Sequence, residues 1–150
     1  TVYGDFDDAW VDETTRPRPR GIYANTKYMG ERLVRTYCHT YGLGTCIIRP
    51  SALYGERCVS RRVSQIFIEN AIQNIDITIN GSGEDSLDFT YIEDLIEGIT
   101  LCCSNKNAIN QTFNLTFGES KKINDLVAIL KNEFLNINVE NSLIQNICVL

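Results

Sequence analysis

Strand-like runs alternate along this chain with segments whose apolar residues recur at helical spacing. Residues 45–48 form a continuous apolar run, as in a strand buried on both faces, and residues 75–80 alternate apolar and polar side chains. Helical spacing predicts helices over about residues 23–41, 59–74, 92–103 and 123–134, and further strands are expected at 87–91 and 111–116. This alternation predicts an α/β fold with a mainly parallel sheet.

The length and charge of the chain argue against several classes of protein. Its 150 residues amount to one domain by length. No apolar run approaches the roughly 20 residues that span a bilayer, and the first residues lack the basic and apolar regions of a signal peptide. A net charge of −5 argues against a general nucleic-acid binder, which would present a basic face. We therefore expect neither a membrane nor nucleic acid as a partner.

The cysteines are scattered rather than clustered. They are Cys38, Cys46, Cys58, Cys102, Cys103 and Cys148. Because none forms a Cys-x-x-Cys pair and His39 is the single histidine, we predict no metal site. Buried, reduced thiols are the expected state, which fits a cytoplasmic protein. A single histidine also argues against a Ser–His or Cys–His nucleophile.

Tyr23 and Lys27 stand four residues apart at the start of the first predicted helix. Residues i and i+4 lie on one face of a helix, so the phenol and the ammonium would project together. A nearby ammonium favours the phenolate form of a tyrosine, which can exchange a proton with a sugar or alcohol hydroxyl. A bare Tyr-x-x-x-Lys more often marks two surface residues on one helix face. The motifs around the pair therefore decide its interpretation.

Four blocks of sequence occur in a fixed order around this pair. They are residues 1–4 (TVYG), 23–27 (YANTK), 49–55 (RPSALYG), and 81–83 (GSG) leading into 88–94 (DFTYIED). Their order and spacing resemble the extended short-chain dehydrogenase/reductases, specifically the NAD-dependent epimerase/dehydratase family acting on nucleotide sugars. The resemblance covers roughly residues 1–130.

The resemblance implies a Rossmann-type NAD-binding domain and a smaller substrate-binding lobe. Residues 1–57 would be the last part of the Rossmann-type domain, with the Tyr–Lys helix. Residues 58–135 would form mainly the α/β substrate lobe, with a strand or helix returning to the Rossmann part, and 136–150 a weakly periodic tail. The sequence has no Gly-x-x-Gly-x-x-Gly turn, so we expect a fragment that lacks the N-terminal NAD-binding half and is inactive alone.

The resemblance also implies roles for individual residues. Tyr23 would be the catalytic acid/base and would lie at the cofactor, and Lys27 would hold the nicotinamide ribose. The backbone at Arg49, Pro50 and Ser51 would lie near the nicotinamide. Substrate contacts are expected at Thr1, Ala52, Arg57, Arg61, Arg62 and Leu87. Many relatives have Asn at the position of Ala52 and Arg at the position of Leu87. Another cation would therefore have to meet the diphosphate, and Arg57, Arg61 and Arg62 are the candidates.

The implied activity is that of a nucleotide-sugar 4-epimerase. Family members that are 4-epimerases often have threonine at the position of Thr1, whereas 4,6-dehydratases and decarboxylases tend to have glutamate. The substrate would be a nucleotide-diphosphate sugar, oxidised transiently at C4 by NAD, and the full-length protein would be a homodimer. A 4,6-dehydratase or reductase of the same family is one alternative. A non-catalytic remnant that binds a nucleotide or a partner is an alternative of another class.

Overall fold

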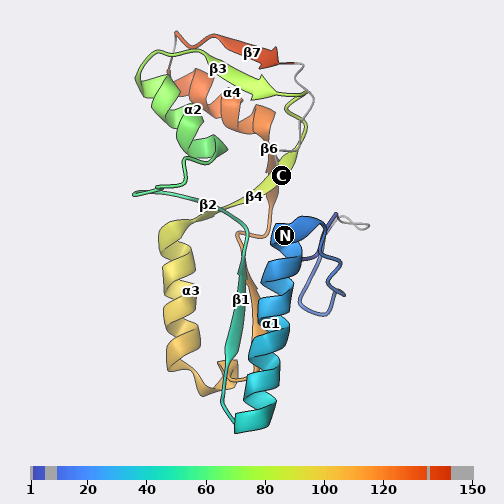
Figure 1. Cartoon of the computed structure of the whole chain (residues 1–150). Helices are drawn as coiled ribbons and strands as arrows, with labels where there is room; N and C mark the ends of the chain where they lie inside the picture. Colours follow the sequence, from blue (N-terminus) through green and yellow to red (C-terminus); the bar gives the residue numbers. More distant parts are fainter. Residues whose placement is uncertain (1, 6–9, 135, 143–150) are drawn as a thin grey trace. The chain divides into compact units, whose positions relative to one another are not determined.

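The computed structural model describes residues 2–5, 10–134 and 136–142 (Figure 1). In chain order the elements are α1 (Gly21–Tyr41), β1 (Cys46–Pro50), β2 (Ala52–Tyr54), α2 (Val63–Ile72), β3 (Ile77–Asn80), β4 (Ser86–Tyr91), α3 (Ile92–Ser104), the 3-10 helix η1 (Lys106–Ala108), β5 (Gln111–Leu115), β6 (Ser120–Lys122), α4 (Ile123–Glu133) and β7 (Val139–Ser142). Three strand pairs in the described residues are parallel and one is antiparallel. The predicted α/β fold with mainly parallel pairing is therefore confirmed.

The chain divides into two compact units. The first contains Thr1–Pro50 and Ile96–Leu115, and the second contains Ser51–Leu95 and Thr116–Leu150. The segment that ends in β5 belongs to the first unit because β5 pairs with β1 in parallel, with Ile48 opposite Phe113.

In the first unit, α1 and the C-terminal part of α3 pack against opposite faces of the β1–β5 pair. Arg35 of α1 donates a hydrogen bond to Thr112 of β5, whereas Gly98 of α3 lies against Leu115, whose side chain points to the other face. A Cβ atom on Gly98 would lie 2.8 Å from Leu115 Cδ1, so glycine permits this close approach. Only Ile47 of β1 is buried, so the expectation of a strand buried on both faces is wrong.

The second unit contains the main hydrophobic core. Its buried members come from α2, β3, α4 and the segment after α4, and they are Phe67, Ala71, Ile77, Ile79, Ile123, Val127, Leu130 and Ile137. β2 pairs with β4 in parallel, β6 pairs with β4 antiparallel, and β3 pairs with β7 in parallel. α2 begins at Val63, four residues later than predicted, and Arg61 just before it has a positive φ of 41° that no α-helix tolerates.

The spacing of apolar residues does not predict three short strands, β2, β6 and β7. β2 and β6 have three residues each, which is too short for a period of two to show. β7 lies inside the expected tail, where Ile77 donates a backbone hydrogen bond to Asn138 and Gly81 donates one to Ser142. Val2 and Tyr3 form a turn.

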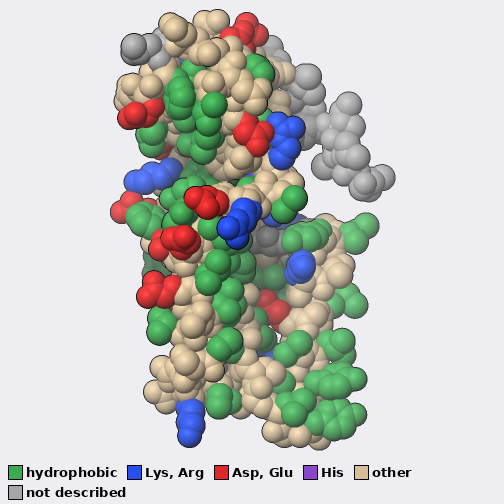
Figure 2. Space-filling view, turned by 90° about the vertical axis from the view of Figure 1, so that its left-hand side faces the viewer, with side chains coloured by type: hydrophobic (Ala, Val, Ile, Leu, Met, Phe, Trp, Pro, Cys, Tyr) green, Lys and Arg blue, Asp and Glu red, His purple; other side chains and the backbone are tan. Residues whose placement is uncertain are grey.

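The described helices include none that is long and apolar enough to cross a membrane. On the face drawn in Figure 2, the Lys and Arg side chains are scattered among Asp and Glu rather than gathered into one patch.

Candidate functional site

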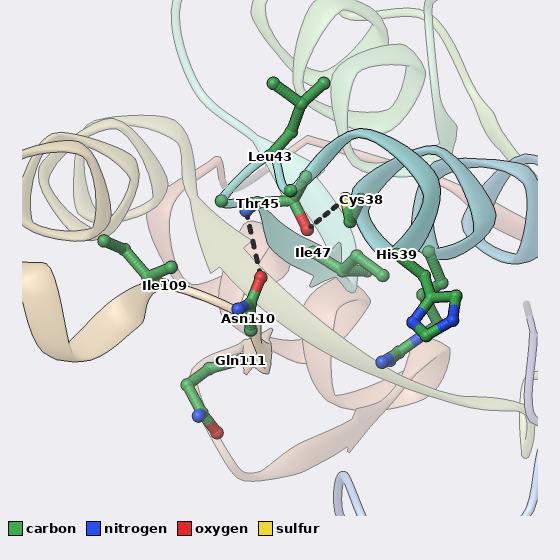
Figure 3. Close-up of a pocket in the computed structure, with 11 residues that line it drawn as sticks. Cys38, His39, Leu43, Thr45, Ile47, Ile109, Asn110 and Gln111 are labelled. Atoms are coloured by element: carbon green, nitrogen blue, oxygen red, sulfur yellow. Dashed lines mark hydrogen bonds between the residues drawn. The ribbon is translucent and has the colours of Figure 1, made fainter.

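A cavity of about 540 Å³ lies in the first unit at the C-terminal end of α1 (Figure 3). Its walls come from the end of α1, the start of β1 and the connection from η1 to β5. Asn110 Oδ1 accepts a hydrogen bond from the Thr45 backbone N–H at 3.3 Å, and the Cys38 thiol lies 3.3 Å from Thr45 Oγ1. None of the site residues predicted from the sequence lines this cavity.

Tyr23 and Lys27 lie at the opposite, N-terminal end of α1. The helix follows Arg20, whose backbone is extended, and begins at Gly21, which has a positive φ of 74°. Lys27 Nζ lies 5.4 Å from the centroid of the Tyr23 ring, a cation–π distance. The Tyr23 side chain is 65% exposed. The phenol and the ammonium therefore share one helix face, and both remain accessible.

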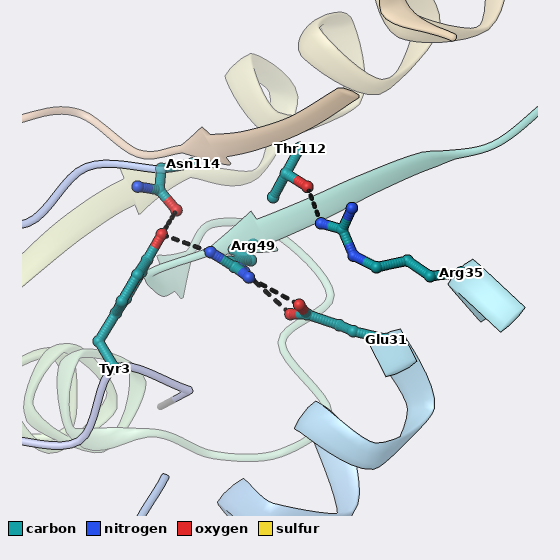
Figure 4. A network of polar contacts seen from close by, with 6 residues as sticks. All are labelled: Tyr3, Glu31, Arg35, Arg49, Thr112 and Asn114. Atoms are coloured by element: carbon teal, nitrogen blue, oxygen red, sulfur yellow. Dashed lines mark hydrogen bonds and ion pairs between the residues drawn. The ribbon is translucent and has the colours of Figure 1, made fainter. Parts of the chain in front are cut away.

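The Arg49 side chain is held inside the first unit (Figure 4). Its Nε and Nη2 donate to the two carboxylate oxygens of Glu31 at 2.9 Å and 2.7 Å, and Nη1 donates to Tyr3 Oη at 2.7 Å. Tyr3 in turn donates to Asn114 Oδ1 at 2.8 Å. The hydrogen bonds to Glu31 raise the pKa of the Arg49 guanidinium above its usual range. All three guanidinium nitrogens of Arg49 have protein partners. A cofactor would therefore contact the backbone of Arg49 rather than its side chain.

In the second unit, Ser51 belongs to a network centred on Asp88. The Ser51 hydroxyl lies 2.7 Å from the Asp88 carbonyl oxygen and 2.7 Å from the Thr90 hydroxyl. The Asp88 carboxylate accepts the backbone N–H groups of Phe117 at 3.0 Å and Gly118 at 2.8 Å. Sequence reasoning gave Asp88 no role, although it opens one of the recognised blocks. The chain enters the second unit twice, just before Ser51 and just before Phe117, and the network holds both of these segments in place.

The expected substrate residues that are described also lie in the second unit. Ala52 is half-buried on β2, opposite Phe89. Arg57, Arg61 and Arg62 are exposed, and Arg61 forms an ion pair with Glu69 at 2.9 Å. Leu87 packs against the hydrophobic core, so its side chain serves the fold of this unit. Thr1 lies outside the described residues.

The described cysteines are all free thiols, but none is buried, so the expectation of buried thiols is wrong. Desolvation, together with Cys102, raises the pKa of the Cys46 thiol. A backbone hydrogen bond from Arg62 lowers the pKa of the Cys58 thiol. Among the described residues, no group of three or more His, Cys, Asp or Glu side chains is arranged to hold a metal ion.

Comparison with known proteins gives a family match and several sequence relatives. The model of the NAD dependent epimerase/dehydratase family matches residues 1–116. A putative UDP-glucose 4-epimerase of Methanocaldococcus jannaschii is 33% identical over 135 residues, which cover 88% of this chain and 43% of that protein. The dTDP-glucose 4,6-dehydratase of Salmonella typhimurium is 30% identical over 115 residues, covering 77% of this chain and 32% of the relative. The chain thus spans less than half the length of these relatives.

Solved structures are similar over nearly the whole chain. The UDP-glucuronic acid 4-epimerase of Bacillus cereus, in complex with UDP-glucuronic acid and NAD, is 29% identical with a TM-score of 0.85, covering 93% of this chain and 45% of that one. The UDP-glucose 4-epimerase of Thermotoga maritima, with UDP-glucose, is 25% identical with a TM-score of 0.85, covering 97% and 49%. These likenesses confirm the expected Rossmann-type architecture.

Proposed function

Because this chain belongs to the NAD-dependent epimerase/dehydratase family, we propose that it is part of a nucleotide-sugar 4-epimerase. The observation that carries the proposal is the Tyr23–Lys27 pair, exposed on one face of α1 with the ammonium 5.4 Å from the phenol ring. The nucleotide-sugar epimerases among the relatives, with UDP-sugars and NAD in their crystal structures, support the same substrate class and cofactor.

The residues present fit the nicotinamide-ribose end of NAD. Neither the Tyr23 hydroxyl nor the Lys27 ammonium has a hydrogen bond or ion pair among the described residues. An ammonium has three donors, and ribose hydroxyls are acceptors that suit them. Lys27 would therefore hold the ribose, and the backbone at Arg49, Pro50 and Ser51 would line the nicotinamide. The glycine-rich turn that binds the pyrophosphate in such proteins is not in this sequence. We therefore propose that these 150 residues alone do not catalyse the reaction.

Bound NAD would supply reversible two-electron oxidation of the sugar alcohol at C4. Tyr23 Oη would take the proton of the 4-hydroxyl during oxidation and return it during reduction. No second proton-transfer residue is therefore needed. The Lys27 charge would favour the form of Tyr23 that accepts the proton. On the substrate side, Arg57, Arg61 or Arg62 would bind the diphosphate. A guanidinium group can donate two parallel hydrogen bonds to phosphate oxygens. Ala52 and Thr1 complete the proposed substrate contacts.

Two other functions remain as alternatives. Dehydratases are also among the relatives that are 30% identical, and a 4,6-dehydratase would release water where an epimerase gives an isomer. Threonine at position 1 favours the epimerase by resemblance. The lack of a Gly-x-x-Gly-x-x-Gly turn in this sequence is the feature that favours a non-catalytic remnant. NAD-dependent turnover by the natural protein that carries this chain would argue against the remnant.

The test of the mechanism is Tyr23→Phe in the natural protein that carries this chain. We expect turnover to fall by roughly 10²- to 10⁴-fold, the usual contribution of a general acid–base group, while NAD binding measured by titration stays unchanged. Tyr41→Phe is the matched control, because Tyr41 lies on the same helix and is also 65% exposed. Equal turnover in both variants would remove Tyr23 from the mechanism.

We also propose a homodimer that forms through α1. The outer stripe of α1, defined as Ile22, Met29, Leu33 and Tyr37, points away from the β1–β5 pair and is 53–81% exposed. Apolar residues at this density on one helix face favour burial against a partner. The free cysteines favour a reducing compartment, and we propose the cytoplasm.

A further inference from the structure

The helix that carries Tyr23 and Lys27 is held in the first unit by very little apolar packing. All 21 residues of α1 are described, and Ala24 is the one that is buried. The apolar residues of its outer stripe face away from the sheet. Because the apolar contact of α1 is so small, polar contacts must fix how the helix is rotated about its own axis and where it lies along the strands.

Two such contacts continue the row that begins with Tyr23 and Lys27. Residues 23, 27, 31 and 35 are spaced by four and form one ridge along α1. Glu31 binds Arg49 of β1, and Arg35 Nη2 donates to Thr112 Oγ1 of β5 at 2.7 Å (Figure 4). Because these residues belong to one rigid helix, the contacts of Glu31 and Arg35 fix the direction in which Tyr23 and Lys27 point.

The Glu31–Arg49 pair is the stronger of these two contacts. Its side chains are only 11% and 9% exposed, and the carboxylate and guanidinium meet through two parallel hydrogen bonds. The same guanidinium lies 4.9 Å from the Tyr3 ring centroid and donates to the Tyr3 hydroxyl. Through Tyr3 the network reaches Asn114 of β5. The Arg49 and Tyr3 side chains together thus link α1, β1, β5 and the N-terminal segment.

We propose that Glu31 and Arg49 are positioning residues that set the orientation of the Tyr23–Lys27 face. The catalytic part of this inference rests on the proposed function, whereas the anchoring of α1 does not. A lysine cannot replace Arg49, because the ammonium lacks the planar fork that binds both Glu31 oxygens and also reaches Tyr3.

The experiment compares Glu31→Gln and Arg49→Lys with the control Glu119→Gln. The control breaks an ion pair of similar length, Glu119–Lys121 at 2.8 Å, but one that is 65% and 55% exposed and lies in the second unit. In the natural protein that carries this chain, we expect kcat to fall roughly 10- to 100-fold in both test variants, since a small misplacement of a reacting group has this effect. KM for the sugar nucleotide should change less than about threefold, and the control should match the unaltered protein. A rise in KM at constant kcat would overturn the proposal.

Hydrogen–deuterium exchange of the same variants tests the anchoring without any turnover. We expect amides of Gly21–Tyr41 to exchange at least about tenfold faster in Glu31→Gln, while amides of Ile123–Glu133 keep their rates. Unchanged exchange in α1 would overturn the proposal, and so would equal acceleration in both helices, which would mean general destabilisation. If Tyr23→Phe keeps full turnover while α1 still loosens in Glu31→Gln, the proposed function fails and the anchoring role stands.

Discussion

Arg49 precedes a proline in a sequence block that, by resemblance, lies near a cofactor. In the folded chain its guanidinium is only 9% exposed and is shared between Glu31 and Tyr3. The residue type was informative, because arginine is suited to bidentate carboxylate binding. Its partners, 18 and 46 residues away in sequence, could not be found from the local pattern.

Gly4 is required by the close approach of another chain segment. Its φ is +74°, and a Cβ atom there would clash with the Arg18 carbonyl oxygen. We expect Gly4→Ala to lower the free energy of unfolding by about 1–3 kcal/mol, because both the backbone conformation and the contact resist a side chain. Urea unfolding of the chain measures this change.

Gly30→Ala is the matched control. Gly30 lies within α1, and a Cβ there would meet nothing within 4 Å. Alanine should raise the free energy of unfolding by about 0.5–1 kcal/mol through helix propensity. Shifts of the same sign in the two variants would contradict the close contact at Gly4.

At the scale of elements, local pattern located the long helices well and the short strands poorly. α1, α3 and α4 begin or end within two residues of the predicted limits. β7 was missed because the asparagine-rich segment that contains it has little periodicity. It is a strand because β3 offers it hydrogen-bond partners from Ile77 to Asn80.

Substitutions on the two faces of β7 test this strand. Val139 packs against the hydrophobic core, whereas Glu140 is exposed. We expect Val139→Asp to lower the free energy of unfolding by about 2–4 kcal/mol, since it places a carboxylate against apolar side chains. Glu140→Asp should change it by less than about 0.5 kcal/mol. Similar small changes in both variants, measured by urea unfolding, would mean that residues 139–142 form a solvated tail.

At the scale of the whole molecule, the chain passes three times between two compact units. The large hydrophobic cluster belongs to the second unit. In the first unit the buried apolar residues among those described are Val2, Tyr3, Ala24, Ile47 and Ala108. The first unit therefore presents apolar side chains on α1 that a partner surface could cover.

The proposed homodimer is tested by Leu33→Glu. Leu33 is 60% exposed in the outer stripe of α1, and Ile129 on α4 is also 60% exposed but lies in the second unit. In the natural protein that carries this chain, Leu33→Glu should convert a dimer into a monomer, because it places charges in the contact. Ile129→Glu should leave the mass unchanged. Light scattering after size-exclusion chromatography reports both masses, and a dimer that persists in Leu33→Glu would exclude the outer stripe as the interface.

Local spacing alone determined the α/β class, the positions of the long helices and the juxtaposition of Tyr23 with Lys27. These features depend on residues that are neighbours along the chain, where the period of a helix or strand fixes which side chains meet. The ordered sequence blocks also identified the family.

Only the tertiary structure decided which distant segments pair. The return of β5 to β1, the Glu31–Arg49–Tyr3 network and the Asp88 contacts with Ser51, Phe117 and Gly118 join residues 18 to 111 positions apart. Such contacts depend on how whole elements pack and on which polar groups remain to be satisfied after packing. No short window of sequence contains that information, so Arg49 and Asp88 gained their structural roles only when the chain was folded.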